Sequence, residues 1–448
     1  MRFQKKLCVM AIASLFPVAS AFAQTSADTR KEIDALKAQL KLLQDKLDVL
    51  SAATGDGSPL SQQVNRLEQK LDLSENTAEA SGFSGMKING VIEAAYKYND
   101  VDKKHDFGAS AGYGVGEVGM IQLTKESQDG EGIDWTLRLM PGGDPFVHEA
   151  SLSIPLNKEN RIIAGLIPDF QGYEYVFPNA TSTLGNQLIT HNALYDLAGA
   201  TAYTGVGMSH VLNGGKVALK WLVGNVDKGS DDKSITFGTD PVSEEPFSGA
   251  ASNGSTLAVA YRMDYYPNDA TYFGLSGLHG SNNRSFNIMA LDAGYTRGDW
   301  QYNGQITVGD MLRAAANGGK AQWTGVSGFV SYKIVPRLQL MARADFIQNS
   351  ANGGGTYYDN GGALLNGLGP ERNAAGEFAV DDLGYATTGA NLTRLTLGTN
   401  YQINANTQWK TEYRLDQSSG YNFEVTDGDT TTYSKTKTSW GTSLVLSF

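Results

Sequence analysis

Apolar and polar residues alternate strictly along many short segments downstream of about residue 86. In one of them Trp300, Tyr302 and Ile306 lie at even positions, while Gln301 and Gln305 fall at odd ones. A period of two is that of a β-strand, in which successive side chains point to opposite faces of the sheet. In segment after segment the second face is polar or charged, which a packed core would not accept. The pattern therefore predicts strands that are apolar on one side and face water on the other.

About sixteen segments share this alternation. They lie near residues 87–98, 114–125, 132–140, 147–156, 160–167, 200–210, 217–225, 255–265, 270–279, 286–297, 300–310, 321–333, 338–347, 391–402, 407–416 and 436–448. From residue 157 onward, short connections such as 157–159 and 404–406 alternate with long ones such as 226–254 and 348–390. Strands that run up and down through a membrane produce this alternation, with tight periplasmic turns and long external loops. We therefore predict an all-β transmembrane barrel of about 16 antiparallel strands in the bacterial outer membrane, formed by residues 81–448.

The first 80 residues carry two other patterns. Residues 1–23 begin with positive charge, continue as an apolar run and end in Ala-Phe-Ala, which predicts a signal peptide cleaved after Ala23. In residues 24–80, the apolar side chains between Ile33 and Leu50 follow the alternating spacing of three and four residues that marks a coiled-coil seam. Because so short a helix is unstable alone in water, we expect this N-terminal α-helical coiled coil and linker to self-associate in the periplasm. A fold-back hairpin and a simple spacer are the alternatives.

Charge and cysteine content narrow the possible partners. The formal net charge is −11, and loss of the basic leader makes it about −14, which argues against a nucleic-acid partner held through phosphate contacts. The one cysteine, Cys8, lies in the leader, so we expect no disulfide. No apolar stretch of about 18 or more residues follows the leader, which argues against a transmembrane helix. The 52 glycines and 21 tyrosines suit a barrel instead.

The last predicted strand ends on an aromatic residue. Trp440, Leu444, Leu446 and Phe448 lie at alternate positions, which resembles the C-terminal signal read by the outer-membrane assembly machinery. We expect the barrel-assembly machinery to bind through terminal Phe448. Outer-membrane lipid is the second expected partner, and peptidoglycan or a periplasmic partner is a further one for the coiled coil.

The third external loop, from about residue 168 to 199, is the candidate constriction of the barrel. In many porins this loop folds inward and narrows the pore, and here it contributes acidic and aromatic side chains. Those expected to line the eyelet are Asp169, Tyr173, Glu174 and Tyr175. The alternative is a loop packed over the rim with no role in selectivity.

Charged residues at inward positions form the second candidate group. They are Arg138, Arg262, Arg343, Asp345, Arg394, Lys410, Glu412 and Arg414. Opposite charges two residues apart, as in Arg262 with Asp264 and Arg343 with Asp345, share one face of a strand and are expected to pair. A solvated wall of neutralised charges is the alternative to an electrostatic filter, and the sign of any selectivity stays open.

Enzyme and metal sites find little support. The five histidines are scattered singly, and neither a nucleophile elbow nor a glycine-rich phosphate loop precedes a helix. We expect no catalysis, no cofactor and no metal. The leading hypothesis is diffusion of small hydrophilic solutes or ions through a water-filled barrel. A structural or adhesive barrel, tethered to the cell wall or a periplasmic partner by its coiled coil, is the alternative.

Several stretches of the chain resemble a Gram-negative porin family catalogued as a domain of unknown function. They are Leu340–Asp345, Asn352–Gly355, Asn366–Pro370 and Glu412–Asp416. The resemblance implies a barrel but no particular substrate. The order of leader, coiled coil and barrel is also similar to that of trimeric porins specific for sugars or phosphate, and this architecture implies a homotrimer.

Overall fold

The computed structural model describes part of the chain between Met86 and Phe448. The described residues are 86–101, 104–111, 119–127, 132–140, 146–174, 187–198, 202–227, 236–239, 246–248, 257–281, 285–312, 315–354, 367–427 and 430–448. The predicted signal peptide, the predicted coiled coil and Tyr175 lie outside them.

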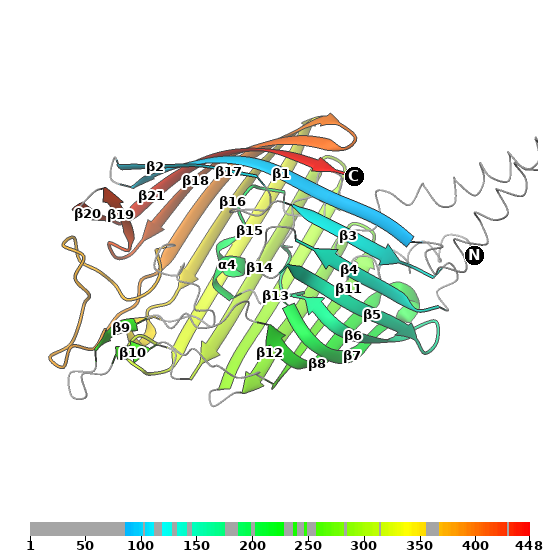
Figure 1. The fold of residues 1–448 in the computed structure, drawn as a ribbon, viewed down its shortest axis with the longest axis horizontal. Coiled ribbons are helices and arrows are strands. Elements are labelled where there is room, and N and C mark those ends of the chain that lie inside the picture. The colour runs from blue at the N-terminus through cyan, green and yellow to red at the C-terminus, as the bar shows by residue number, and fades with distance from the viewer. Residues whose placement is uncertain are drawn as a thin grey trace, which may run out of the picture.

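The described strands form one large antiparallel sheet that closes on itself (Figure 1). Its strands are β1 (Met86–Val101), β2 (Lys104–Ala111), β3 (Met120–Lys125), β4 (Asp134–Leu139), β5 (Val147–Pro155), β6 (Asn160–Pro168), β7 (Ala202–Leu212), β8 (Val217–Asp227), β11 (Leu257–Asn268), β12 (Thr271–Ser281), β13 (Ser285–Arg297), β14 (Trp300–Met311), β15 (Ala321–Val335), β16 (Leu338–Gln348), β17 (Leu392–Asn404), β18 (Thr407–Ser418) and β21 (Thr436–Ser447). Each strand from β3 to β18 pairs with its neighbour in chain order, and β21 pairs with both β18 and β1. The pairing of β1 with β21 closes the barrel.

One position in the wall is shared by two strands. Along one edge of β1, residues Met86–Val91 pair with β3 and residues Ala94–Val101 pair with β2. Strands β2 and β3 therefore lie end to end beside β1. The 17 strands of the sheet therefore occupy 16 positions around the described barrel, which confirms the predicted strand number. The sequence reading missed β2, because Lys104–Ala111 lacks a clear alternation, and it began the next strand at residue 114 whereas β3 begins at Met120.

Polar side chains of the wall are buried and apolar ones are exposed, the reverse of the arrangement in a soluble protein. On β15, Ser327 is 1% exposed and its neighbour Val326 is 46% exposed. On β17, Arg394 is 1% exposed and Leu395 49%. Apolar side chains thus point outward and polar ones inward, as in a barrel surrounded by lipid.

The short connections lie together at one end of the barrel and are stabilised by asparagine side chains. Asn157, Asn268 and Asn404 each accept hydrogen bonds with Oδ1 from backbone N–H groups two residues ahead, at 2.8 to 2.9 Å. These Asx turns fix tight reversals. Beside the turn at residues 298–299, the exposed ring of Trp300 packs against Tyr302 and Tyr332, with centroids 5.6 and 4.5 Å away. Such an aromatic girdle marks a membrane interface.

The opposite end of the barrel carries the long connections. They contain α4 (Ala193–Ala198), the hairpin of β9 (Thr236–Thr239) with β10 (Pro246–Ser248), η2 (Ala351–Gly353) and the hairpin of β19 (Phe423–Asp427) with β20 (Thr430–Ser434). A 3-10 turn, η1 (Asn213–Gly215), joins β7 to β8 at the short-turn end. Among the described residues, no helix is long and apolar enough to cross a membrane.

Candidate functional site

The connection between β6 and β7 folds into the barrel. We call its described parts, residues 169–174 and 187–198, the inward loop. Leu188 and Leu194 of this loop lie over wall glycines, since a Cβ atom added to Gly398 or Gly325 would meet their Cδ2 atoms at 2.4 and 1.9 Å. The wall therefore leaves room for the loop at positions that carry no side chain. Figure 1 shows α4 of this loop within the barrel.

Arg262 on β11 holds the first part of the inward loop. Its Nη1 donates to the carbonyl oxygens of Phe170 and Gly172 at 3.3 and 3.0 Å. Its charge is compensated by Asp264 at 2.7 Å and by Asp292 on β13 at 2.9 Å. A guanidinium has five donors in a rigid fork, so one side chain binds two wall carboxylates and two loop carbonyls at once.

Arg343 on β16 holds both parts of the loop together. Its Nη1 lies 2.7 Å from the Glu174 carboxylate and donates to the Thr190 carbonyl at 2.9 Å. Its Nη2 donates to the His191 carbonyl at 2.6 Å, and its Nε lies 3.3 Å from Asp345. The arginine is fully buried, so loss of its charge would leave two carboxylates without compensation in a site shielded from water.

Wall carboxylates complete the attachment from the other side. Glu412 on β18 accepts hydrogen bonds from the backbone N–H groups of Ile189 and Thr190 at 2.8 and 3.0 Å. Asp345 accepts one from the Ala193 N–H at 3.1 Å. The loop backbone, which has no sheet partners here, is thereby satisfied by side chains of the wall.

The aromatic residue Tyr173 is anchored within the lumen. Its hydroxyl lies 2.7 Å from Ser327 Oγ, and its backbone N–H donates to Gln305 Oε1 at 3.3 Å. Burial, together with the neighbouring Glu174 carboxylate, raises the pKa of the Tyr173 hydroxyl above its usual range. Tyr173 is therefore a neutral hydrogen-bonding group of the inward loop.

The structure brings the remaining predicted residues to the wall around this loop. Arg394 bonds Asp416 at 2.9 Å and the His191 carbonyl at 3.3 Å. Arg414 also pairs with Asp416, at 3.0 Å. Lys410 is buried within reach of the charge of Glu412.

Arg138 lies elsewhere on the wall, on β4. It pairs with Glu149 of β5 at 3.1 Å, and Gln122 of β3 accepts its Nη2 proton at 2.7 Å. These partners belong to the wall, whereas Arg262, Arg343 and Arg394 also bind the inward loop.

The sequence reading missed several members of the site. Gln305, Asp292 and Tyr203 were seen only as parts of alternating strands, and Asn192 was not singled out. The Tyr203 hydroxyl on β7 donates to Asp169 at the start of the inward loop, a contact that no period in the sequence could indicate. Asn192 directly precedes a short helix, and an asparagine in that position is a recognisable N-cap signal.

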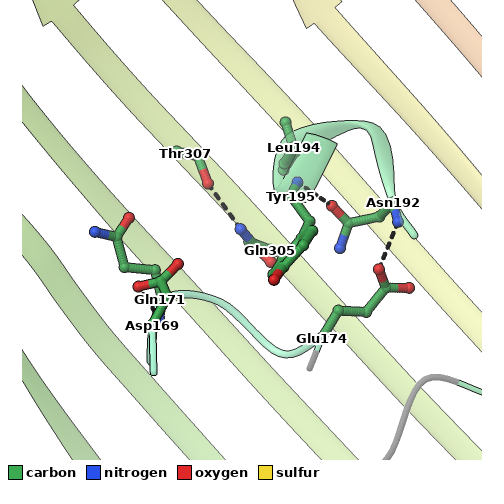
Figure 2. A pocket seen from close by; sticks show the side chains of 8 residues that line it. All are labelled: Asp169, Gln171, Glu174, Asn192, Leu194, Tyr195, Gln305 and Thr307. Carbon is green, nitrogen blue, oxygen red and sulfur yellow. Dashed lines mark hydrogen bonds between the residues drawn. The ribbon is translucent and has the colours of Figure 1, made fainter. Parts of the chain in front are cut away.

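A polar hollow lies between the inward loop and β14 (Figure 2). Its cavity volume is only about 10 Å³, which is room for about one water molecule. Its lining residues are Asp169, Gln171, Glu174, Asn192, Leu194, Tyr195, Gln305 and Thr307. In the part of the chain covered by the structure, no group of three or more His, Cys, Asp or Glu side chains is arranged to hold a metal ion.

Comparison with solved structures found several porins that align with most of the chain. The anion-selective porin from Comamonas acidovorans aligns with a TM-score of 0.50 and 8% identity, over 81% of this chain and 99% of that one. OmpF of Salmonella typhi, solved with daunomycin, aligns with a TM-score of 0.45 and 14% identity over 81% and 97%. OmpT of Vibrio cholerae in its trimer form gives 0.47 and 12% over 81% and 99%. The Comamonas protein and this chain share a fold.

A search of curated proteins found no match. A family model described as "Protein of unknown function (DUF3138)" matches residues 110–276 and 266–448. This match covers most of the chain, and it confirms the family resemblance seen in the sequence. The chain belongs to the DUF3138 family, whose member described here has the barrel fold of outer-membrane porins.

Proposed function

We propose that this protein is an outer-membrane porin through which small hydrophilic solutes or ions diffuse, with the inward loop as its constriction. The observation that carries the proposal is the set of arginines, Arg262, Arg343 and Arg394, that hold the loop backbone inside a polar-lined barrel. A loop fixed part of the way along a lumen narrows it at a defined point. Rings of charge and hydrogen-bonding groups at such a point sort solutes.

The predicted eyelet residues have distinct places in this proposal. Asp169 and Glu174 line the hollow beside the loop, and Tyr173 lies against the wall. The paired charges of the wall, including Arg262 with Asp264 and Arg343 with Asp345, support the loop rather than face solutes as free charges. Selectivity is therefore assigned to the loop, and the wall ion pairs position it.

We further propose a homotrimer with a periplasmic coiled coil. Strands β3 and β4 have six residues each, whereas β11 to β18 have 11 to 15. A strand needs about 9–11 residues to cross the membrane, so this side of the barrel suits an interface with other copies.

Both ends of the barrel chain lie at the end that carries the short turns. The start of β1 and Phe448 lie together there, as the Gly90 N–H donates to the Phe448 carbonyl at 2.8 Å. Residues 24–80 and terminal Phe448 would then face the periplasm, where peptidoglycan and the barrel-assembly machinery are proposed partners.

Liposome swelling tests the proposed diffusion. Purified, folded protein is reconstituted into vesicles, and the swelling rate is measured with neutral sugars of increasing size. A porin gives swelling that falls steeply with solute size, because the constriction excludes larger molecules. No swelling above protein-free vesicles would contradict the proposal and would favour the structural or adhesive barrel.

A further inference from the structure

The inner face of the barrel is apolar over a wide arc near the end that carries the long loops. Inward side chains of adjacent strands lie in one row there, and each is at most 3% exposed. The row consists of Leu222 on β8, Ala260 on β11, Leu278 on β12, Ile288 on β13 and Trp323 on β15. This part of the wall is therefore covered by protein rather than by water.

Residues of the loops form one hydrophobic core with this apolar arc. Phe170 and Leu194 of the inward loop belong to the same buried cluster as the wall residues, and so do Leu368 and Phe423 of the long connections. Burial of apolar surface stabilises such packing, and a close-packed apolar core does not accept hydrophilic solutes. A route for solutes at this end of the barrel therefore follows another part of the wall.

The inner face of β18, β21 and β1 is polar instead and partly exposed. We call five inward residues of these strands the basic arc: Lys97, Asn99, Arg414, Lys437 and Ser439. Strand pairing places Ser439 between Asn99 and Arg414, and its hydroxyl donates to Asn99 Oδ1 at 2.7 Å. All five side chains are partly exposed, in contrast to the row of the apolar arc.

The basic arc borders the inward loop. Two residues beyond Ser439 on the same face of β21, a Cβ atom added to Gly441 would meet Ile189 Cδ1 of the loop at 3.3 Å. Gly441 pairs with Glu412 of β18, which accepts the backbone N–H groups of Ile189 and Thr190. Ser439 therefore lies next to the loop, on its side toward the long connections.

Cations lie at the surface of the basic arc, and the carboxylates lie beneath it. The Arg414 side chain is 11% exposed, whereas its partner Asp416, at 3.0 Å, is 1% exposed. Lys437 is opposite Asp416 in the strand pairing and is partly exposed. Glu412 is 4% exposed and binds the loop. A solute that moves along this face therefore meets positive groups.

We propose that small anions approach the constriction along the basic arc. Its guanidinium and ammonium groups attract an anion and donate charge-assisted hydrogen bonds to carboxylate or phosphate oxygens. Charged groups that line a pore set its selectivity, so the basic arc adds a preference for negative charge to the size limit of the inward loop. The inference rests on the proposed porin function, because the arc acts on solutes only if the lumen conducts.

The test attaches charge at Ser439 in the folded protein. Ser439→Cys in planar bilayers is treated with water-soluble methanethiosulfonates, one carrying a sulfonate and the other a trimethylammonium group. Ser276→Cys is the matched control, since Ser276 is an inward serine of β12 that is 0% exposed. The intact protein is the control for the reagents, because its one cysteine, Cys8, lies in the predicted leader. Conductance and reversal potential under a salt gradient are measured before and after treatment.

We expect all three proteins to prefer anions before treatment. In Ser439→Cys the sulfonate should lower the conductance and shift the reversal potential toward cations, and the trimethylammonium group should shift it toward anions. Neither reagent should change Ser276→Cys or the intact protein. Unchanged currents of Ser439→Cys, equal effects on Ser276→Cys, or a cation preference of the intact protein would overturn the basic arc as the route of anions while the porin remains. Absence of any current from all three folded proteins would instead overturn the proposed porin function.

Discussion

A few buried arginines hold the inward loop inside the barrel. Arg343 joins Glu174, the carbonyls of the second half of the loop and Asp345 in one group. The sequence predicted that Arg343 and Asp345 pair, because residues two positions apart in a strand lie on the same face. It could not predict the partners in the loop, since contacts 150 to 170 positions apart follow from the closed barrel and have no local pattern.

Replacement of Arg343 tests this group. Arg343→Met leaves two buried carboxylates uncompensated, so we expect a loss of about 3–5 kcal/mol in unfolding free energy. Guanidinium titration in micelles, followed by tryptophan fluorescence, measures the change. Lys87→Met is the control, because Lys87 pairs with a partly exposed Glu126 and such a pair contributes only about 0–1 kcal/mol. Equal losses in the two variants would contradict the proposed role of Arg343.

The strands were largely predictable, and their connections were not. The expected segments 300–310 and 338–347 correspond to β14 and β16, which end one residue later than expected. Alternation determines the face of each residue, which explains this success. The hairpin of β19 with β20 is a local pairing that lies between two of the expected segments and was not predicted. The inward path of the third loop depends on contacts between distant residues, and the sequence left it open against a loop over the rim.

Substitution of wall glycines tests how α4 packs against β15. In Gly325→Val, the added atoms meet Leu194 Cδ2, which lies 1.9 Å from the position of a Cβ. We expect α4 to shift and stability to fall by about 1–3 kcal/mol, as in an overpacked core. Gly328→Val on the same strand is the matched control, because nothing lies within 4 Å of its Cβ position. The measurement is the temperature at which each variant loses its folded mobility on a gel. Similar midpoint temperatures for the two variants would argue against the packing described.

The whole molecule is a barrel with its apolar side outward, and this inversion predicts how charge is tolerated. Val326 is exposed near the middle of β15, and Val335 is exposed at its turn end. In the membrane-spanning arrangement, Val326→Lys should cost about 2–4 kcal/mol and Val335→Lys about 0–1 kcal/mol. Reversible unfolding in lipid vesicles measures both. No difference between the two depths would contradict a lipid-facing surface.

The most direct test of the account is single-channel conductance in planar bilayers, with the reversal potential measured under a salt gradient for the intact protein and Asp169→Asn. The account predicts discrete current steps in both. It also predicts a reversal potential that moves toward greater preference for anions in the variant, because a carboxylate beside the constriction has lost its charge. Folded protein that gives no steps, or steps whose reversal potential is unchanged by Asp169→Asn, would contradict a pore constricted by the inward loop.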